Sequence, residues 1–280
     1  MASKKNKHAP GQTGALSDQV VWVTGAGSGI GAAVARRMAQ LGATVVMTGR
    51  RREPLERVHA DITKAGGQAW IRQGDLSKAS TSKKIAAAID KKFGRLDILV
   101  NNAGINVLKR SWQDLAPESV DAIMSANLNG AFYCSIAVLP IMRRQKNGLL
   151  IHTASWAGRF ISGLSGPAYT ASKHAVVAMS HSINLEEFAN GIRSTVVNPG
   201  EVATEILDKR PVPVPPADRA RMLQAEDLAA SIAHVALAPA HVCLNEILIS
   251  PTWNRLAAAG SAKAKPKARP KAKAKRKTKA

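Results

Sequence analysis

Tyr169 and Lys173 stand four residues apart in the segment Tyr-Thr-Ala-Ser-Lys. Residues at this spacing point from the same face of a helix. A neighbouring ammonium group favours the phenolate and lowers the pKa of the phenol from its usual value of about 10. The pair is therefore suited to exchanging a proton with an alcohol oxygen near neutral pH. Because ordinary surface neighbours share the same spacing, the pair acquires meaning only together with the rest of the chain.

A glycine-rich turn near the N-terminus is the second chemically informative feature. The apolar run Val20–Thr24 leads into Gly25, Gly27, Gly29 and Gly31, and a helical pattern follows. Glycines let the backbone approach a diphosphate, and the helix N-terminus favours its negative charge. A tight turn without a ligand is the alternative, but four glycines within seven residues favour a dinucleotide site.

The end of the second apolar run bears on which nicotinamide cofactor is bound. The run ends in Thr-Gly followed by Arg50, Arg51 and Arg52, without a carboxylate. An NAD site usually has an acidic residue here, whereas arginine binds the 2′-phosphate of NADP. The sequence therefore favours NADP, with NAD as the second possibility. In the alternative interpretation these arginines are solvated residues at a helix start, with Arg52 paired to Glu56.

Strand-like and helical patterns alternate from about residue 19 to residue 250. Continuous Val, Ile and Leu runs are typical of strands that are covered on both faces. Repetition of strand and helix predicts a single α/β domain with a doubly wound, Rossmann-type parallel sheet flanked by helices. The expected strands are Val20–Thr24, Thr44–Thr48, Ala69–Gln73, Leu96–Asn101, Leu149–Thr153, Ser194–Asn198 and Ile247–Ile249. The expected helices are Ile30–Leu41, Pro54–Ala65, Ser77–Phe93, Pro117–Gln145, Ala168–Asn190 and Ala225–Leu237.

The net charge of +21 comes mainly from the two ends of the chain. Residues 261–280 hold ten lysines and arginines and no acid. We expect a basic disordered N-terminus (1–17), a catalytic domain (18–256) and a disordered Lys/Ala/Pro-rich tail (257–280), which has no large apolar residue to bury. Such a tail could contact DNA, RNA or another polyanion without reading sequence, which is the alternative function; a merely solubilising tail stays equally open.

Composition also limits the class of protein. No apolar run approaches the roughly 20 residues that cross a bilayer, and the basic start is not followed by an apolar signal segment. Cys134 and Cys243 lie in apolar segments and are interpreted as buried, reduced thiols. No histidine or cysteine spacing is typical of a metal site. We therefore expect a cytoplasmic protein without a membrane span or metal ion.

The segment 205–224 interrupts the alternation of strands and helices, and includes a proline-rich stretch. A long insertion at this place is typical of a lid or a binding loop. Asn106, Trp156 and Glu201 are further candidate neighbours of a substrate pocket. Two alternatives stay open, namely that Trp156 is packed in the core and that Glu201 is a rim carboxylate in solvent.

Several short motifs occur together in a fixed order, and over roughly residues 17–252 the chain resembles the short-chain dehydrogenase/reductase family. The resemblance implies an enzyme that moves a hydride between a nicotinamide cofactor and a small alcohol or carbonyl compound. Its long helices also imply a homodimer or homotetramer. The matching residues are Thr24-Gly-x-x-x-Gly29-x-Gly31, Asp75, Asn101-Asn-Ala-Gly104, Asn127, Ser155, Tyr169-x-x-x-Lys173 and Pro199-Gly200-x-Val202-x-Thr204.

The resemblance also implies a role for each matching residue. Tyr169 would donate or accept the proton, and Lys173 would lower its pKa and hold the nicotinamide ribose. Ser155 would bind the substrate oxygen, and Asn127, rather than Asn129, would hold a water that leads to Lys173. Besides Tyr169 and Lys173, the implied cofactor contacts are Thr24, Gly25, Ser28, Gly29, Ile30, Gly31, Arg50, Arg51, Asp75, Leu76, Asn102, Ala103, Gly104, Pro199, Gly200, Val202 and Thr204.

One departure from the family pattern concerns the serine. Ser155 stands fourteen residues before Tyr169, one more than the family's usual spacing. We expect one extra loop residue, with Ser155 still placed directly after the fifth strand; Ser162 and Ser165 are the alternatives. A hydrolase built on Ser155 and His152 is disfavoured, because the chain has no Gly-x-Ser-x-Gly motif and a regular strand would point His152 away.

Overall fold

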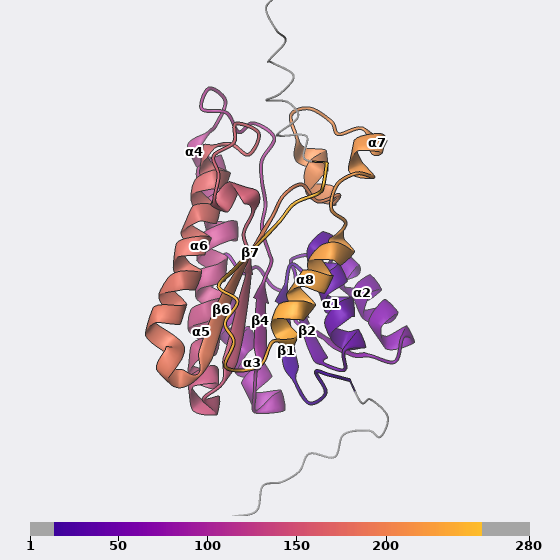
Figure 1. The fold of residues 1–280 in the computed structure, drawn as a ribbon, viewed down its shortest axis with the longest axis vertical. Helices are drawn as coiled ribbons and strands as arrows, with labels where there is room; N and C mark the ends of the chain where they lie inside the picture. Colours follow the sequence, from indigo (N-terminus) through magenta and orange to yellow (C-terminus); the bar gives the residue numbers. More distant parts are fainter. Residues whose placement is uncertain (1–13, 254–280) are drawn as a thin grey trace, which may run out of the picture.

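A seven-stranded parallel sheet forms the centre of the molecule in the computed structural model, which describes residues 14–253 (Figure 1). The strand order is β3-β2-β1-β4-β5-β6-β7, and every neighbouring pair is parallel. The predicted fold class is therefore confirmed. The strands are β1 (Val20–Thr24), β2 (Thr44–Thr48), β3 (Gln68–Ile71), β4 (Ile98–Asn101), β5 (Gly148–Thr153), β6 (Ile192–Pro199) and β7 (Glu246–Ile249).

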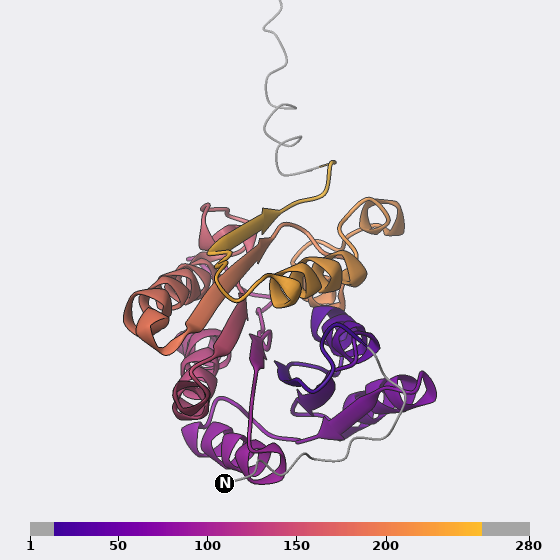
Figure 2. The ribbon, with the colours of Figure 1, turned by 60° about the horizontal axis from the view of Figure 1, so that its bottom comes forward.

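Helices cover both faces of the sheet (Figure 2). One face carries α1 (Gly29–Gln40), α2 (Arg52–Lys64) and α8 (Ala225–Leu237). The other carries α3 (Ala79–Phe93), α4 (Pro117–Met124), α5 (Gly130–Gln145) and α6 (Pro167–Glu187). The short helical segments are η1 (Ser125–Asn129), η2 (Trp156–Gly158), η3 (Phe188–Asn190), η4 (Glu205–Lys209) and α7 (Pro216–Arg219).

The alternating side chains of β1 divide between two apolar cores. Val21 and Val23 pack with α1 and α8, whereas Val20 and Trp22 face the opposite layer. The indole N–H of Trp22 donates to Thr48 Oγ1 at 2.9 Å, which satisfies its one buried polar atom. Because both faces of the strand are covered, side chains on both faces are apolar, and the strand appears in the sequence as a continuous apolar run.

After β3 the chain returns to the middle of the sheet, where β4 pairs with the free side of β1. From β1 it proceeds to β2 and β3 on one side, and from β4 it proceeds to β5, β6 and β7 on the other. The loops after β1 and β4 therefore diverge and leave a crevice at the carboxyl ends of the strands. In open parallel sheets this is the place where ligands bind.

The predicted elements agree closely with the structure. β1, β2 and α8 begin and end at the predicted residues. β4 begins at Ile98 rather than Leu96, because the carboxylate of Asp97 accepts the Val20 N–H at 2.8 Å in place of a ladder bond. The predicted helix 117–145 is interrupted by the π-helical turn η1, which carries Asn127. Mid-helix turns of this kind are frequent at functional sites.

Two predictions about individual residues and boundaries were wrong. Leu16 is 1% exposed and belongs to the core under α1, so the packed domain includes residues before 18. Cys243 is exposed, whereas Cys134 is buried as predicted, and burial raises the pKa of the Cys134 thiol to about 12. The rest of the predicted N-terminal segment (1–13) and the predicted tail (257–280) lie outside the described residues.

Length and composition alone would let one described helix, Pro117–Gln145, cross a membrane. This helix comprises α4, η1 and α5, and it packs on α3, α6 and the sheet. Its buried side chains, including Cys134, Val138 and Met142, fill the core of that layer. Its apolar composition thus reflects its place between the sheet and neighbouring helices.

An ion pair fastens the end of α6 to α5. The Arg143 guanidinium donates two hydrogen bonds through Nε and one through Nη2 to the nearly buried carboxylate of Glu187, and this contact lowers the pKa of Glu187. A carboxylate with a lowered pKa stabilises the fold above its usual pKa of 4.5, and the contribution is lost as the pH falls through the folded value.

We predict that Glu187→Gln lowers the free energy of unfolding by about 1.5 kcal/mol at pH 7. The difference from the unmodified protein should shrink as the pH falls below 4.5, because both proteins then lack the charge. Urea unfolding at several pH values measures this. Glu186→Gln, which changes the exposed neighbour, is the matched control, and a pH-independent difference would contradict the prediction.

Candidate active site

A cleft of about 810 Å³ opens at the carboxyl ends of the strands, where the fold predicts a ligand. It extends from the glycine turn after β1 to the loops beyond β4, β5 and β6. Most of the predicted site residues line it, namely Gly25, Ser28, Gly29, Ile30, Arg50, Arg51, Asn102, Ala103, Gly104, Ser155, Tyr169, Lys173, Pro199, Gly200, Val202 and Thr204.

The glycine turn is shaped for close approach of a backbone or ligand. A Cβ added to Gly31 would lie 2.6 Å from Asn102 Nδ2 and closer still to the carbonyl oxygen of Gly25. The first turn of α1 contains no acidic residue, so its N–H groups face the cleft without a competing carboxylate. These residues fit the diphosphate of a dinucleotide, which a helix N-terminus attracts.

Five predicted site residues lie outside the cleft lining, namely Thr24, Gly31, Asp75, Leu76 and Asn127. Thr24 is structural here, because its hydroxyl accepts the backbone N–H groups of Asn102 (2.9 Å) and Ala103 (3.0 Å). The Asp75 carboxylate accepts the hydroxyl of Ser77 at 2.8 Å, and this bond lowers the pKa of Asp75. The Thr24 hydroxyl thus holds the loop after β4 against the end of β1.

The arginine cluster divides into two environments. Arg52 pairs with Glu56 at 2.7 Å, as the sequence suggested. Arg50 and Arg51 are exposed and line the cleft, and Arg51 also lies 3.7 Å from Glu205 of η4. Two guanidinium groups thus stand beside the glycine turn, where an adenosine 2′-phosphate would need them.

Lys173 lies at the centre of the site. It is 4% exposed, and its ammonium group donates to the Thr153 carbonyl oxygen at 2.8 Å. Burial lowers the pKa of Lys173 to about 8. Asn127 approaches the same place, since a Cβ on Gly104 would lie 3.2 Å from Asn127 Oδ1 and 3.6 Å from Lys173 Nζ.

Asn127 is held by the loop after β4. Its Oδ1 accepts the Ile105 N–H at 2.7 Å, and its Nδ2 donates to the Ile105 carbonyl oxygen at 3.0 Å. Nδ2 also lies 3.2 Å from the hydroxyl of Ser172 on α6. The amide therefore joins the π-helical turn, the β4 loop and the helix that carries Lys173.

The pKa of Tyr169 moves against the prediction from spacing. Removal from solvent raises it above 10, and a hydrogen bond with Ser155 and the charges of Arg110 and Arg210 lower it to a smaller extent. Lys173 Nζ lies 5.6 Å from the centroid of the Tyr169 ring, over its face. The prediction that the helical neighbour dominates was wrong, because desolvation at the cleft wall outweighs the nearby charges.

Ser155 is brought beside Tyr169 despite the extra residue between them. It precedes η2 and accepts the Ala157 N–H at 3.1 Å, while its side chain also hydrogen-bonds Tyr169. Between Ser155 and Tyr169 the chain forms η2 and a loop, and Trp156 of η2 contacts Phe160 of that loop with ring centroids 4.6 Å apart. Trp156 is partly buried and does not line the cleft.

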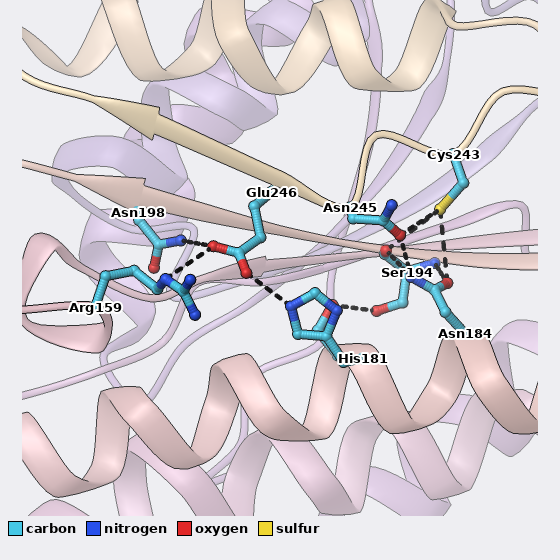
Figure 3. A network of polar contacts seen from close by, with 9 residues as sticks. Arg159, His181, Asn184, Ser194, Asn198, Cys243, Asn245 and Glu246 are labelled. Atoms are coloured by element: carbon cyan, nitrogen blue, oxygen red, sulfur yellow. Dashed lines mark hydrogen bonds and ion pairs between the residues drawn. The ribbon is translucent and has the colours of Figure 1, made fainter.

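A polar network holds Arg159, which directly follows η2, against α6 and the last two strands (Figure 3). The Glu246 carboxylate of β7 contacts Arg159 at 3.3 Å, His181 of α6 at 2.7 Å and Asn198 of β6 at 3.3 Å. Alongside it, Asn184 of α6 exchanges two hydrogen bonds with the backbone of Ser194. Four segments are thereby held together on the side of β5 away from the glycine turn.

His152 lies outside the cleft lining. It is fully buried, and its Nδ1 lies 3.2 Å from Asn101 Nδ2. Burial, assisted by the charge of Lys173, lowers the pKa of His152 to about 3. A neutral imidazole at this depth is not paired with Ser155, so the hydrolase alternative finds no support. Within residues 14–253, no group of three or more His, Cys, Asp or Glu side chains could hold a metal ion.

The part of the cleft that is lined by Arg110, Glu201 and Arg210 differs from what the sequence suggested. Glu201 is 6% exposed and pairs with Arg210, so its interpretation as a rim carboxylate in solvent was wrong. Arg110 was not singled out at all, yet it is buried and lines the cleft. It follows the Asn-Asn-Ala-Gly motif by several residues at no characteristic spacing, and only tertiary packing places it in the site.

Comparison with known proteins agrees with this geometry. A sequence model of the family described as short chain dehydrogenase matches residues 19–212. An uncharacterized oxidoreductase of Staphylococcus aureus (strain MRSA252) is 33% identical over 236 residues, which are 84% of this chain and 98% of that protein. A metagenomic short-chain oxidoreductase solved with NADP has a TM-score of 0.74 and 33% identity, covering 85% of this chain and 99% of that chain.

A closed form of serine dehydrogenase solved with NADP+ has a TM-score of 0.75 and 28% identity, covering 83% of this chain and 95% of that chain. The chain therefore belongs to the short-chain dehydrogenase family. It is an oxidoreductase with an NAD(P) site, as the resemblance of its motifs implied.

We expect the buried ammonium group of Lys173 to lower the free energy of unfolding of the protein. A buried lysine whose pKa falls from 10.5 to about 8 binds its proton less tightly in the folded chain than in the unfolded one. The free energy of unfolding therefore rises with pH between these values, and the full penalty applies at pH 7. We predict that Lys173→Met raises the free energy of unfolding by about 1–2 kcal/mol at pH 7.

Denaturant titrations at pH 7 and at pH 9.5 check this prediction. The gain should be smaller at the higher pH, where the folded protein already holds a neutral amine. Lys84→Met, on the exposed face of α3, is the control and should change little. A loss of stability in Lys173→Met at pH 7 would show that the bond to Thr153 outweighs the desolvation of the amine.

Proposed function

We propose that this protein is an NADP-dependent oxidoreductase that interconverts a small alcohol and its carbonyl compound, with Tyr169 as the proton donor and acceptor. The observation that carries the proposal is the meeting of Tyr169, Ser155 and Lys173 in one cleft with the glycine turn and Arg51. Proton chemistry and dinucleotide recognition thus share a single continuous space.

Each residue of the site has a separate role in this reaction. NADP, when bound, supplies or accepts the hydride at the carbinol carbon. Tyr169 Oη donates the proton to the carbonyl oxygen in reduction and takes it from the hydroxyl in oxidation. Ser155 Oγ holds the same oxygen. Because burial raises the pKa of Tyr169, its phenol is protonated at neutral pH, which is the form that reduction needs.

Lys173 is placed to support this proton transfer electrostatically. Its ammonium group is anchored to Thr153 and lies over the Tyr169 ring, so it stabilises negative charge that develops on the phenol. Asn127, next to Lys173, would hold a water that returns the proton to solvent. The preference for NADP over NAD rests on Arg50 and Arg51, and the two solved relatives named above were obtained with NADP or NADP+.

We further propose a cytoplasmic homodimer or homotetramer whose contact uses the outer faces of α5 and α6. Large apolar side chains are exposed there, namely Phe132, Ile136, Leu185 and, directly after α6, Phe188. An exposed apolar surface of this kind is typical of a subunit interface. A catalytic domain that includes Leu16 and extends to about residue 256, with basic flanking segments, is part of the same proposal.

Replacing the proposed acid gives the most direct test. Tyr169→Phe should lower kcat for reduction of small aldehydes and ketones by about 100-fold or more, because the phenol proton is lost while the ring remains. The Kd for NADPH should stay within about twofold, since the ring makes no charge-assisted bond to phosphate. Stopped-flow turnover and NADPH fluorescence measure the two quantities.

The chain offers a matched control, because Tyr133 on α5 is the one other tyrosine in the sequence. Tyr133→Phe should turn over like the unmodified protein. Unchanged turnover in Tyr169→Phe would contradict the proposed acid. Absence of NADP(H)-dependent turnover of any small alcohol, aldehyde or ketone by the unmodified protein would contradict the proposed function itself.

The arginine cluster is tested by cofactor affinity. Arg51→Gln should weaken NADPH binding by about 10-fold and leave NADH binding unchanged, because only NADPH carries a 2′-phosphate. Fluorescence titration of both cofactors measures this. Arg52→Gln removes the same charge one residue away, where it is paired with Glu56, and should have little effect. Equal loss for both cofactors in Arg51→Gln would contradict the NADP preference.

A further inference from the structure

Two guanidinium groups line the cleft on the Tyr169 side, away from the glycine turn. Arg110 comes from the loop after β4, and Arg210 follows η4. The charges of both act on the Tyr169 phenol, and the charge of Arg210 also acts on Arg110. Two like charges thus reach the cleft that holds Tyr169 from separate segments of the chain.

Arg110 is held there by packing. Its side chain is 7% exposed, and Nη1 lies 3.4 Å from the carbonyl oxygen of Leu164. Its stem passes over Gly166, which has a φ of +79° and where an added Cβ would lie 2.9 Å from Arg110 Cβ. Asn106, also buried, donates to the Ser165 carbonyl oxygen at 3.0 Å and joins the same two loops.

Charged side chains of both signs meet at this end of the cleft, where Glu201 pairs with Arg210. The other carboxylates that line the cleft lie elsewhere in ion pairs, Glu205 with Arg51 and Asp208 with Arg219. Arg110 thus places a buried guanidinium group in the wall of the same cleft as Tyr169, where a ligand can reach it.

We propose that the substrate carries a carboxylate close to its reacting carbon, and that Arg110, supported by Arg210, binds it. The substrate class is then a short hydroxy acid and the corresponding oxo acid. This inference rests on the proposed function. In the oxidation, Tyr169 first releases its phenol proton to solvent. The carbinol C–H and O–H bonds then break, the hydride passes to NADP+ and the proton to the phenolate oxygen of Tyr169, so that a C=O bond forms and the carboxylate is unchanged.

A planar guanidinium suits a carboxylate because both present two parallel bonding directions. Orientation by this contact would hold the neighbouring carbinol against Tyr169 and Ser155. The competing explanation is that Arg110 acts only on the phenol of Tyr169. That role would be the same for acids and for neutral alcohols, whereas a carboxylate contact affects acids alone.

The test uses the full chain with NADP+ and matched substrate pairs, namely both enantiomers of 2- and 3-hydroxybutyrate and their methyl esters. For the best acid, kcat/KM should exceed that of its ester by about 10-fold or more. Arg110→Gln should lower kcat/KM for the acid by about 10- to 100-fold, mainly through KM, and change the ester by less than about threefold. Arg110→Lys should retain part of the preference.

Lys109→Gln, which removes one exposed positive charge next to Arg110, is the control and should preserve the ratio of acid to ester. Equal turnover of acids and esters by the unmodified protein would overturn the inference and leave the proposed function standing. An equal loss for acid and ester in Arg110→Gln would assign Arg110 to Tyr169 instead. If Arg110→Gln fails to fold, the acid-to-ester ratios of the unmodified protein and of Arg110→Lys decide.

A binding measurement separates this inference from the proposed function. With NADP+ present, 3-hydroxybutyrate should raise the melting temperature of the unmodified protein but not that of Arg110→Gln, and its methyl ester should raise neither. If no substrate of either class is turned over, the proposed function fails for these compounds while the shift still reports the carboxylate site. No acid-specific shift in the unmodified protein overturns the inference.

Discussion

The hydrogen bond from Lys173 to the Thr153 carbonyl oxygen joins α6 to the end of β5, and the rest of the site is arranged around it. It requires an amine in a place that excludes water, which is why the pKa of Lys173 falls to about 8. It also fixes the rotation of α6, and so determines that Tyr169 faces the cleft. An exposed lysine that could move into solvent would not orient α6 in this way. The burial of Lys173 is unfavourable for its charge, but it also gives the side chain a fixed position.

The same arrangement accounts for what could be read from the sequence. Continuous apolar runs such as Val20–Thr24 and the glycines after it are local patterns with few structural solutions, so the sheet, its helices and the cofactor turn could be predicted. Tyr169 and Lys173 share a helix face through local spacing. The direction of the Tyr169 pKa, the ion pair of Glu201 and the burial of Arg110 depend on which segments meet in three dimensions, and no local pattern encodes that.

Support for the site comes from beyond the cleft as well. Glu246 on β7 gathers Arg159, His181 and Asn198, and so links the last strand of the sheet to the loop that follows Ser155 (Figure 3). Asn127 performs a similar task from the opposite side, between the β4 loop and α6. The segments that carry the serine and the lysine are thus joined by polar contacts to different parts of the fold.

Crowding at Gly31 determines how this enzyme can be redesigned. Even a methyl group there would meet Asn102 Nδ2 and the carbonyl oxygen of Gly25, and that amide and carbonyl belong to the β4 loop and the β1 turn themselves. The position of Gly31 therefore admits no side chain, whereas Arg50 and Arg51 are exposed. Substitutions that change cofactor choice can therefore be made at Arg50 and Arg51, but not at Gly31.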